Sequence, residues 1–502
     1  MNTGIWREYH EATKHTTQSL ANSRHVLDWP NMPDPFRHYE GAPLLDLPAD
    51  PAAPKIPTIA LLEGAFGGTT AGTGAEFLSQ LLFYSAAISA SKLVSSNGYR
   101  YALRVNPSSG NLHPTEFHFF TRGLRRWPDG LYHYRPSSHM AEQRALNPFQ
   151  EELDGISAPV VFILTSIAWR EAWKYQDRAY RYCLHDVGHA WQSLVLAARA
   201  TGCDSFARGQ FPDDEISQLC RLNPDEWPML IVELHGATIP LDDFRRSGAV
   251  AHKPEWSGGE ANQLSHEQAV YPLLDRVHAA TKLTKKLAQE GYGRTRRQIP
   301  ENSFPIRPPE IHDFSAFGKI ARARRSALNF QGGDRAISLP HLLTILSCAV
   351  QPLSADFADK RFIQLYLYVH RVQGLEPGVY GYDSSQRKLE KIHSGDQRVR
   401  AAALSLRQDM AANACVAFSL VGNLSSATRL YGDRGYRYVH FEAGAIGQAL
   451  YLAAEALGLG ASGIGAFFDN DVNSYLGLNS TEKQVVYHFA IGYPVPDPRM
   501  EA

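Results

Sequence analysis

The chain has 502 residues, and its 50 basic and 51 acidic side chains leave a formal net charge of −1. Such a balance produces no strong field of one sign, which argues against nucleic acid, an anionic membrane or a polyacidic protein as partner. We therefore expect a small-molecule or peptide-derived substrate. The longest apolar runs, such as 158–164, are too short to span a bilayer, and residues 1–15 are polar, so we expect a soluble cytoplasmic protein.

The five cysteines are scattered along the chain, and no two of them have metal-ligand spacing. Most lie in apolar helical or strand contexts, which predicts buried free thiols in a reducing compartment rather than a disulfide framework. We expect no metal site.

The first half of the chain predicts a helix over 77–87, strands over 116–121 and 159–165, a long helix over 178–201 and a last strand over 229–234. Gly202 is a stop signal for the long helix. The stretch 237–311 is rich in proline, glycine and charge, which predicts a linker with one helix near 269–290. We place a domain boundary near Val250.

The second half predicts the same elements in the same order: a helix over 339–350, strands over 364–369 and 414–420, a long helix over 434–457 that Gly458 ends, and a strand over 485–491. If the loop before each long helix hides one more strand, the order in each half is α, β, β, β, α, β. This mixture of elements predicts an α+β fold.

The two halves are copies of each other. Residues 173–182 align with 429–438, and the match runs without a gap to Asn223 over Asn479, with about 19 identities in about 51 positions. Shorter matches pair Gly130-Leu-Tyr-His-Tyr134 with Gly378-Val-Tyr-Gly-Tyr382, and His10-Glu-Ala-Thr-Lys14 with His278-Ala-Ala-Thr-Lys282. We therefore expect two tandem domains, 1–250 and 251–502, which form a pseudo-dimer within one chain.

Two motifs are set aside. Gly458-Leu-Gly-Ala-Ser-Gly463 spells a dinucleotide fingerprint, but it follows a predicted helix and leads into a strand, the reverse of what that fingerprint needs. His185 and His189 have zinc-ligand spacing on a helix, yet the aligned residues are Phe441 and Ala445. We interpret His185 and His189 as ordinary helix histidines.

Two polar elements carry more information. The loop Pro107-Ser108-Ser109-Gly110-Asn111 combines hydroxyls, an amide and a permissive glycine, which suits the polar edge of a flat heterocycle. The run Arg324-Arg325-Ser326 precedes a helix and offers guanidinium forks and a hydroxyl for a phosphate. Taken alone, each also fits a simpler interpretation, a plain turn for the loop and a solvated basic patch for the run.

With these elements, the halves resemble the nitroreductase-like flavoprotein fold and, within it, the SagB-type dehydrogenases, the azoline oxidases of peptide biosynthesis. The resemblance covers almost the whole chain and rests on these segments: Tyr9 to Lys14, Pro107 to Pro114, Lys174-Tyr175, Arg178 to Tyr182, Arg324 to Ser326, Ile464 to Asp469 and Ile491 to Pro494. It implies a central, largely antiparallel sheet flanked by helices in each half, with FMN at the interface.

The resemblance assigns parts of one flavin site to both halves. From the second half it implies phosphate contacts at Arg324, Arg325 and Ser326, with Arg499 as an additional contact, and a ring-edge turn at Ile464, Gly465 and Ala466. From the first half it implies Arg104, Pro107, Ser108, Ser109, Gly110 and Asn111.

The alignment leaves no second complete site. Ala355-Asp-Phe-Ala-Asp359 takes the place of the serine loop in the second half, and Glu63-Gly-Ala65 takes the place of the arginine run in the first. Asp356, Asp359 and Glu63 would bring negative charge toward a polyanionic cofactor. We therefore expect one FMN per chain.

The resemblance implies a catalytic role for Lys174 and Tyr175, because azoline oxidases use a Lys-Tyr pair. The second half has Leu430 and Tyr431 at these places, so only the first half keeps the amine. Azoline oxidation needs a base for the ring proton and a hydride acceptor, which flavin N5 would be. Which residue of the pair is the base is left open.

Two departures limit the resemblance: Leu328 stands where the family usually has a further basic residue, and the loop continues Ser109-Gly-Asn-Leu-His. The family implies a peptide substrate and a cyclodehydratase partner. Two alternatives stay open, an NAD(P)H-dependent reductase of nitroaromatics or quinones on the same fold, and a degenerate binding protein. The sequence leaves open whether O2 or NAD(P)H is the electron partner, and whether chains pair further.

Overall fold

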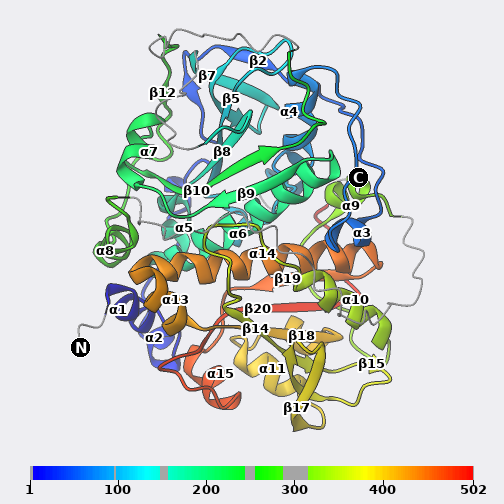
Figure 1. Ribbon diagram of the computed structural model, residues 1–502. Coiled ribbons are helices and arrows are strands. Elements are labelled where there is room, and N and C mark those ends of the chain that lie inside the picture. Colours follow the sequence, from blue (N-terminus) through cyan, green and yellow to red (C-terminus); the bar gives the residue numbers. More distant parts are fainter. Residues whose placement is uncertain (1–3, 95–97, 147–155, 243–254, 286–314, 501–502) are drawn as a thin grey trace.

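The computed structural model describes residues 4–94, 98–146, 156–242, 255–285 and 315–500. Each half of the chain folds into an antiparallel sheet with one long helix packed on it. Figure 1 shows the two long helices crossing the middle of the molecule, with the sheet of the first half above them and that of the second half below. The chain is thus two α+β domains in face-to-face contact through their helices.

The sheet of the first half has the strand order β11-β7-β6-β5-β8-β10-β9, and β2 also pairs with β7. All of these pairs are antiparallel. The bounds are β2 Leu44–Asp46, β5 Thr115–Thr121, β6 Gly130–Arg135, β7 Met140–Leu146, β8 Val160–Ile167, β9 Asp204–Arg208, β10 Glu226–His235 and β11 Glu255–Trp256.

The sheet of the second half follows the same plan, in the order β17-β16-β14-β18-β20-β19. Its strands are β14 Ile363–Val369, β16 Gly378–Asp383, β17 Lys388–Ser394, β18 Val416–Gly422, β19 Gly460–Ile464 and β20 Gln484–Gly492. Three small pairs complete the strands: β1 Tyr39–Glu40 with β12 Glu260–Ala261, β3 Ile88–Val94 with β4 Tyr99–Arg104, and β13 Ile337–Ser338 with β15 Val372–Gln373.

The helices also recur in both halves. The first has α1 Ile5–Ala12, α2 Thr17–Ala21, α3 Thr58–Leu62, α4 Gly74–Phe83, α5 Ala168–Tyr175, α6 Ala179–Ala200 and α7 Asp213–Leu219. Then come α8 Pro272–Thr281, α9 Phe317–Ala323, α10 Leu339–Ala349, α11 Arg398–Leu404, α12 Asp409–Asn413, α13 Leu424–Tyr431, α14 Gly435–Ala456 and α15 Asp469–Tyr475. Within the described ranges, no helix is both long enough and apolar enough to traverse a bilayer.

The predicted helices and strands are found within a few residues of their expected bounds. Gly202 and Gly458 follow the two long helices with φ of +86° and +71°, as helix-ending glycines do. The prediction of a further strand just before each long helix is wrong, because α5 and α13 occupy those places. The reason is visible in α5, where Trp169, Ala172 and Trp173 are buried at helical spacing.

The segment between the halves is described in part. The boundary expected near Val250 lies outside the described residues, and so do 286–290 of the expected helix, which is found as α8. Beyond that boundary, β11 and β12 pair with β7 and β1 of the first half.

Both ends of the chain reach across to the opposite half. In α1, His10 contacts the Tyr436 hydroxyl at 3.1 Å, and Figure 1 shows this helix beside the second half. At the other end, the Arg499 carbonyl accepts the Leu93 amide at 3.0 Å, and Asp497 pairs with Lys92 at 2.8 Å. The halves are therefore joined by exchanged arms as well as by their helices.

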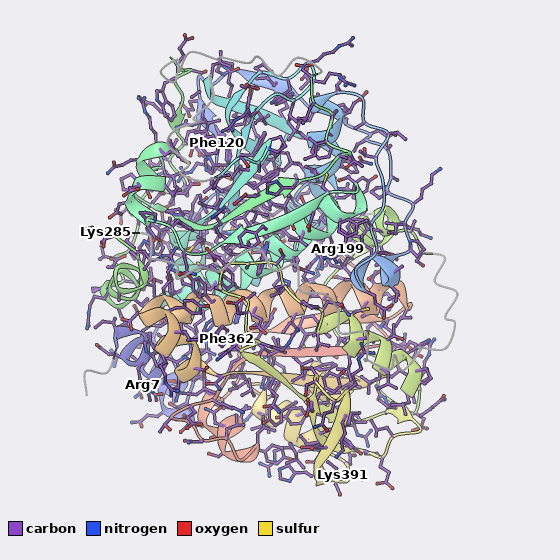
Figure 2. All side chains as sticks on the ribbon, in the orientation of Figure 1. Arg7, Phe120, Arg199, Lys285, Phe362 and Lys391 are labelled. Carbon is purple, nitrogen blue, oxygen red and sulfur yellow. The ribbon has the colours of Figure 1, made fainter. Side chains whose placement is uncertain are left out.

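The two long helices touch at a pair of glycines. A Cβ at Gly188 of α6 would lie 2.3 Å from the Phe441 carbonyl oxygen, and one at Gly444 of α14 would lie 2.2 Å from the His185 carbonyl oxygen. Around this contact, the largest cluster of buried apolar side chains runs through both halves, and side chains fill the space between the sheets (Figure 2). All five cysteines are buried free thiols, as predicted.

Gly188→Ala tests this contact. Alanine is ordinarily favoured over glycine inside a helix by about 1 kcal/mol, but here the methyl group would overlap backbone atoms. We expect the free energy of unfolding to fall by about 1–3 kcal/mol in chemical denaturation. The control is Gly68→Ala, whose Cβ would have no atom within 4 Å. A Gly188→Ala variant more stable than the wild type would contradict the close crossing.

Candidate functional site

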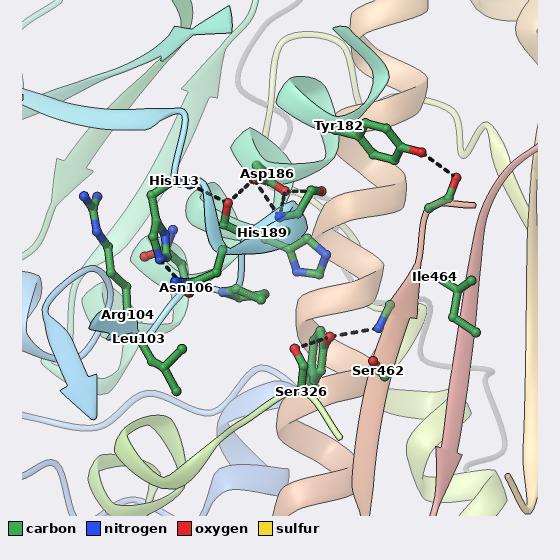
Figure 3. Close-up of a pocket in the computed structure, with 18 of the residues that line it drawn as sticks. Leu103, Arg104, Asn106, His113, Tyr182, Asp186, His189, Ser326, Ser462 and Ile464 are labelled. Carbon is green, nitrogen blue, oxygen red and sulfur yellow. Dashed lines mark hydrogen bonds between the residues drawn. The ribbon is translucent and has the colours of Figure 1, made fainter. Parts of the chain in front are cut away.

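A cavity of about 360 Å³ lies between the two halves. The serine loop of the first half lines one side, and the arginine run with the turn after β19 lines the other (Figure 3). Ser109 and Ser326 thus face one cavity, as the split of motifs requires. Of the residues expected in the site, these line it: Arg104, Pro107, Ser108, Ser109, Gly110, Asn111, Tyr175, Arg324, Arg325, Ser326, Ile464, Gly465 and Ala466.

The serine loop is anchored on α6 by one carboxylate. Asp186 accepts hydrogen bonds from the Ser108 hydroxyl at 2.6 Å, the Ser109 hydroxyl at 3.0 Å and the Ser109 amide at 3.1 Å (Figure 3). The backbone then takes positive φ at Gly110 (+59°), Asn111 (+61°) and His113 (+50°). The left-handed conformation is costly for residues with a side chain, so these anchoring bonds hold a strained loop in place.

The arginine run has hydrogen-bond donors at the cavity that lack an acceptor among the described residues. Arg324 donates from Nε to the Val105 carbonyl at 3.0 Å and from Nη2 to the Arg104 carbonyl at 3.3 Å, and Arg325 bonds Ser89. Among the described residues, Arg324 Nη1 and Arg325 Nε are buried without an acceptor. Burial lowers the pKa of Arg325 to about 10, which still leaves it charged at neutral pH. Buried, charged donors without acceptors favour an anionic ligand.

The third member of the run is tied to β19. The Ser326 and Tyr451 hydroxyls lie 2.8 Å apart, and the Tyr451 hydroxyl also accepts the Gly463 amide at 2.8 Å. Ser326 forms a parallel bridge with Ala461. Gly463 lies in β19, a strand that comes after the helix α14. A dinucleotide fingerprint would instead follow a strand and open a helix, so the structure agrees with its rejection.

The turn after β19 needs a glycine because an aromatic ring from the other half lies against it. A Cβ at Gly465 would lie 2.1 Å from Cε1 of Tyr182, and the Tyr182 hydroxyl donates to the Gly465 carbonyl at 3.1 Å. Arg178 also donates to this carbonyl at 3.2 Å, and it pairs with Asp469 at 3.1 Å. Tyr182 of α6 and Arg178, just before that helix, thus position the cavity wall that the second half supplies.

Lys174 and Tyr175 lie at the end of α5, behind the serine loop. A Cβ at Gly110 would be 2.7 Å from the Tyr175 hydroxyl and 3.1 Å from Lys174 Nζ. Tyr175 lines the cavity, with its ring centroid 4.3 Å from that of Tyr182; Lys174 is not among the lining residues. Burial, with smaller contributions from Glu171, Tyr182 and Asp186, raises the pKa of Tyr175 well above its usual range. Its phenol therefore stays protonated at neutral pH.

Two other expected residues lie differently. The Arg104 guanidinium donates to the Pro35 carbonyl at 2.6 Å and lies 5.3 Å from the Phe36 ring centroid. The Arg104 carbonyl accepts a hydrogen bond from Arg324. Arg104 thus contributes to the site more through its backbone than through its charge. Arg499 is exposed and pairs with Asp497 at 2.8 Å; it is not among the residues that line the cavity.

The equivalent place on the other side of the pseudo-symmetry axis is filled by the chain itself. Asp356 accepts the Gly209 amide at 2.8 Å and the Gln210 amide at 3.2 Å, and these residues align with Gly465 and Ala466. Phe357 is 2% exposed and stacks on Tyr438 at 4.2 Å. What closes this second place is therefore the packing of Phe357, and not the like-charge repulsion that the sequence leads us to expect. Glu63 and Asp359 are exposed side chains.

The sequence alone did not identify several residues that line the cavity: Lys92, Leu103, Asn106, His113, Tyr182, Asp186, His189, Gln408, Tyr451, Ser462, Gly463 and Tyr487. Tyr182, Asp186 and His189 share one face of α6, and that spacing was the available signal. His189, which the sequence predicts to be an ordinary helix histidine, has Nε2 3.2 Å from the Tyr487 hydroxyl. Burial lowers the pKa of His189 to about 3, so it is neutral at neutral pH.

Comparisons with known proteins agree with the duplication. The sequence profile described as the nitroreductase family matches twice, at 85–236 and 321–493. A crystal structure from Anabaena variabilis, assigned as a nitroreductase, is similar with a TM-score of 0.78 at 28% identity over 98% of this chain and 100% of that one. A Methanocaldococcus jannaschii protein with the same assignment is 38% identical over 114 residues, 23% of this chain and 58% of that protein. The chain thus spans little more than half of this curated relative.

Tyr451→Phe tests the link between the arginine run and β19. The change leaves the half-buried Gly463 amide without its acceptor. A typical hydrogen bond contributes about 0.5–1.5 kcal/mol net, so we expect the free energy of unfolding to fall by about that amount in urea. The matched control is Tyr366→Phe, a buried tyrosine whose hydroxyl has no hydrogen-bond partner among the described residues. Equal stability of both variants would show that the Tyr451 hydroxyl holds neither partner.

Proposed function

The chain belongs to the nitroreductase family of oxidoreductases, and from this premise we propose that it is an FMN-dependent oxidoreductase with one flavin site per chain. The observation that carries the proposal is a pair of guanidinium groups, the buried Arg324 and the half-buried Arg325, each with one buried nitrogen that has no acceptor among the described residues, beside the same cavity as the serine loop. A phosphate would satisfy those donors, and a cavity of about 360 Å³ has the size of a cofactor site.

We assign the cofactor contacts by chemistry. Arg324, Arg325 and Ser326 would hold the phosphate, since charge-assisted bonds from two guanidinium groups suit a dianion. The turn at Gly465 and Ala466 and the serine loop would face the ring from opposite halves. When bound, FMN supplies a two-electron acceptor that takes a hydride at N5.

For the reaction, we propose dehydrogenation of an azoline-like ring in a peptide-derived substrate, with a cyclodehydratase as the enzyme that supplies it. This rests on Lys174 and Tyr175, whose polar ends lie against Gly110 of the serine loop. We assign the base to Lys174, the amine that only the first half keeps; in its unprotonated form it would take the proton from the ring carbon, and its Nζ would lie 3.1 Å from a Cβ at Gly110 of the cavity wall. Tyr175 would orient the substrate by hydrogen bonding.

The second candidate is an NAD(P)H-dependent reductase of nitroaromatics or quinones. Its support is the assignment of the Anabaena and Methanocaldococcus relatives as nitroreductases. A binding protein without activity is disfavoured, because the two halves lost complementary elements and together keep a complete set.

The flavin content of the purified protein tests the proposed site. We expect about one FMN per chain, measured by absorbance of the released flavin, because Phe357 fills the equivalent place. Arg325→Ala removes a charged phosphate contact and should weaken FMN binding about 10- to 100-fold. The control is Glu63→Ala, an exposed side chain at the position aligned with Arg324, which should leave FMN binding unchanged. A stoichiometry near two, or a colourless protein that takes up no FMN, would overturn the proposal.

Lys174→Ala tests the proposed base. We expect oxidation of azoline peptides to fall by about 10²- to 10⁴-fold, the usual contribution of a general base, while FMN stays bound with an unchanged visible spectrum. The control is Leu430→Ala, the aligned residue of the second half, which is 49% exposed. Full activity of Lys174→Ala would refute the assignment. Rapid bleaching of the flavin by NAD(P)H, without turnover of azoline peptides, would favour the reductase.

A further inference from the structure

The arginine run of the second half packs on the β3–β4 hairpin of the first half. Arg325 donates to the Ser89 hydroxyl at 3.1 Å and to the Ser89 carbonyl at 3.0 Å. Arg324 donates to the carbonyls of Val105 and of Arg104, the last residue of β4. The hairpin thus contacts both guanidinium groups. Side chains of the hairpin that reach the cavity are therefore candidates for the ligand group that the two arginines bind.

One side chain of this hairpin is a cation, Lys92 of β3. Lys92 and Leu103 both line the cavity, and Figure 3 labels Leu103 beside the arginine run. The two residues share one face of the hairpin, because Leu103 lies opposite Ala90 and Lys92 follows Ala90 by two residues. Lys92 is three residues along β3 from Ser89, the partner of Arg325. The cavity therefore has a lysine from the first half next to the arginines of the second.

The C-terminal segment connects the two walls of the cavity at this end. The Val495 amide donates to the carbonyl of Asn329, which follows the arginine run, at 2.9 Å. Further along, Met500 forms an antiparallel bridge with Lys92. The segment therefore passes from the arginine run of the second half to β3 of the first, and it holds Lys92 by its backbone.

A carboxylate of the same segment orients the Lys92 side chain. The ammonium nitrogen of Lys92 lies 2.8 Å from Asp497, and the two side chains are 19% and 11% exposed. Asp497 also accepts hydrogen bonds from Nε and Nη2 of Arg499, both at 2.8 Å. One carboxylate thus faces two cations, so the three groups together keep a net positive charge. An ammonium group has three donors, and one ion pair does not use them all.

Lys92 stands where the sequence led us to expect Arg499. Arg499 is exposed and is not among the residues that line the cavity, whereas Lys92, which pairs with the same carboxylate, lines it. Leu328, two residues after the arginine run, is 47% exposed and brings no charge. Beside the two arginines, therefore, the positive charge at this end comes from β3.

The chemistry of a phosphate monoester suits donors from both walls. Such a group carries about 1.5 to 2 negative charges at neutral pH and has three strong acceptor oxygens. Arg324 and Arg325 each have one buried nitrogen without an acceptor among the described residues. Both belong to one segment of the second half, whereas Lys92 approaches from the first half. Three cations on two sides can bind more of the phosphate oxygens than two cations on one side.

We propose that Lys92 is a phosphate-binding residue of the flavin site, supplied by the first half to the phosphate that Arg324 and Arg325 hold from the second. This inference rests on the proposed function, because it takes FMN as the ligand. Lys92 would bind a phosphate oxygen, and Arg499 would keep Asp497 paired. Both halves of the chain then bind the phosphate as well as the ring.

Lys92→Gln tests this role through a comparison of FMN with riboflavin, which has the same ring and ribityl chain but no phosphate. Each flavin is titrated with the full chain freed of its own flavin, and Kd is measured by quenching of flavin fluorescence. We expect the Kd for FMN to rise about 5- to 20-fold, the effect of losing one charge-assisted hydrogen bond. The Kd for riboflavin should not change. Lys92→Arg, which keeps the charge, should retain part of the preference for FMN.

The control is Lys319→Gln, an exposed lysine of α9 that is not among the residues lining the cavity, and it should change neither Kd. If Lys92→Gln does not fold, Lys92→Met, which keeps the apolar stem, takes its place. Equal losses for FMN and riboflavin, or no loss for either, would overturn the role of Lys92 alone. A wild-type chain that binds neither flavin would instead refute the proposed function, and this inference with it.

Discussion

The contact between Gly188 and Gly444 is the constraint on which the rest of the structure depends. Without side chains at these positions the two long helices approach until the backbone of each meets the other, and no larger residue fits. This approach places the serine loop, carried by α6, opposite the arginine run and β19 of the second half. A wider helix separation would open the cavity to solvent and part its two walls.

Ion pairs across the axis hold the same arrangement from outside the crossing. Two arginines of the first half, Arg178 and Arg181, pair with Asp469 of the second half. The aligned Arg434 and Arg437 of the second half pair with Asp213 of the first. Equivalent ion pairs thus bind the two halves together. These pairs are buried, and removing one partner would strand a charge in the interior. The duplication has therefore conserved the scaffold in both halves while the two sites diverged.

Divergence of the sites followed from local substitutions on this common scaffold. In one site, hydroxyls and glycine leave space and polar edges. At the equivalent place, Asp356 caps two backbone amides and Phe357 fills the volume on Tyr438. A site can thus be closed by a single aromatic residue whose neighbour satisfies the exposed amides, without disturbing the helix crossing that both sites share.

The sequence by itself determined the duplication, the long helices with their terminal glycines, and the assignment of the serine loop and the arginine run to opposite halves. Those features are written in local periodicity and in direct comparison of the copies. It did not reveal Asp186 under the loop, Phe357 in the second site, or α5 where a strand was expected. Contacts between segments far apart in the chain decide these, because a side chain's partner, burial and protonation depend on packing that no local pattern records.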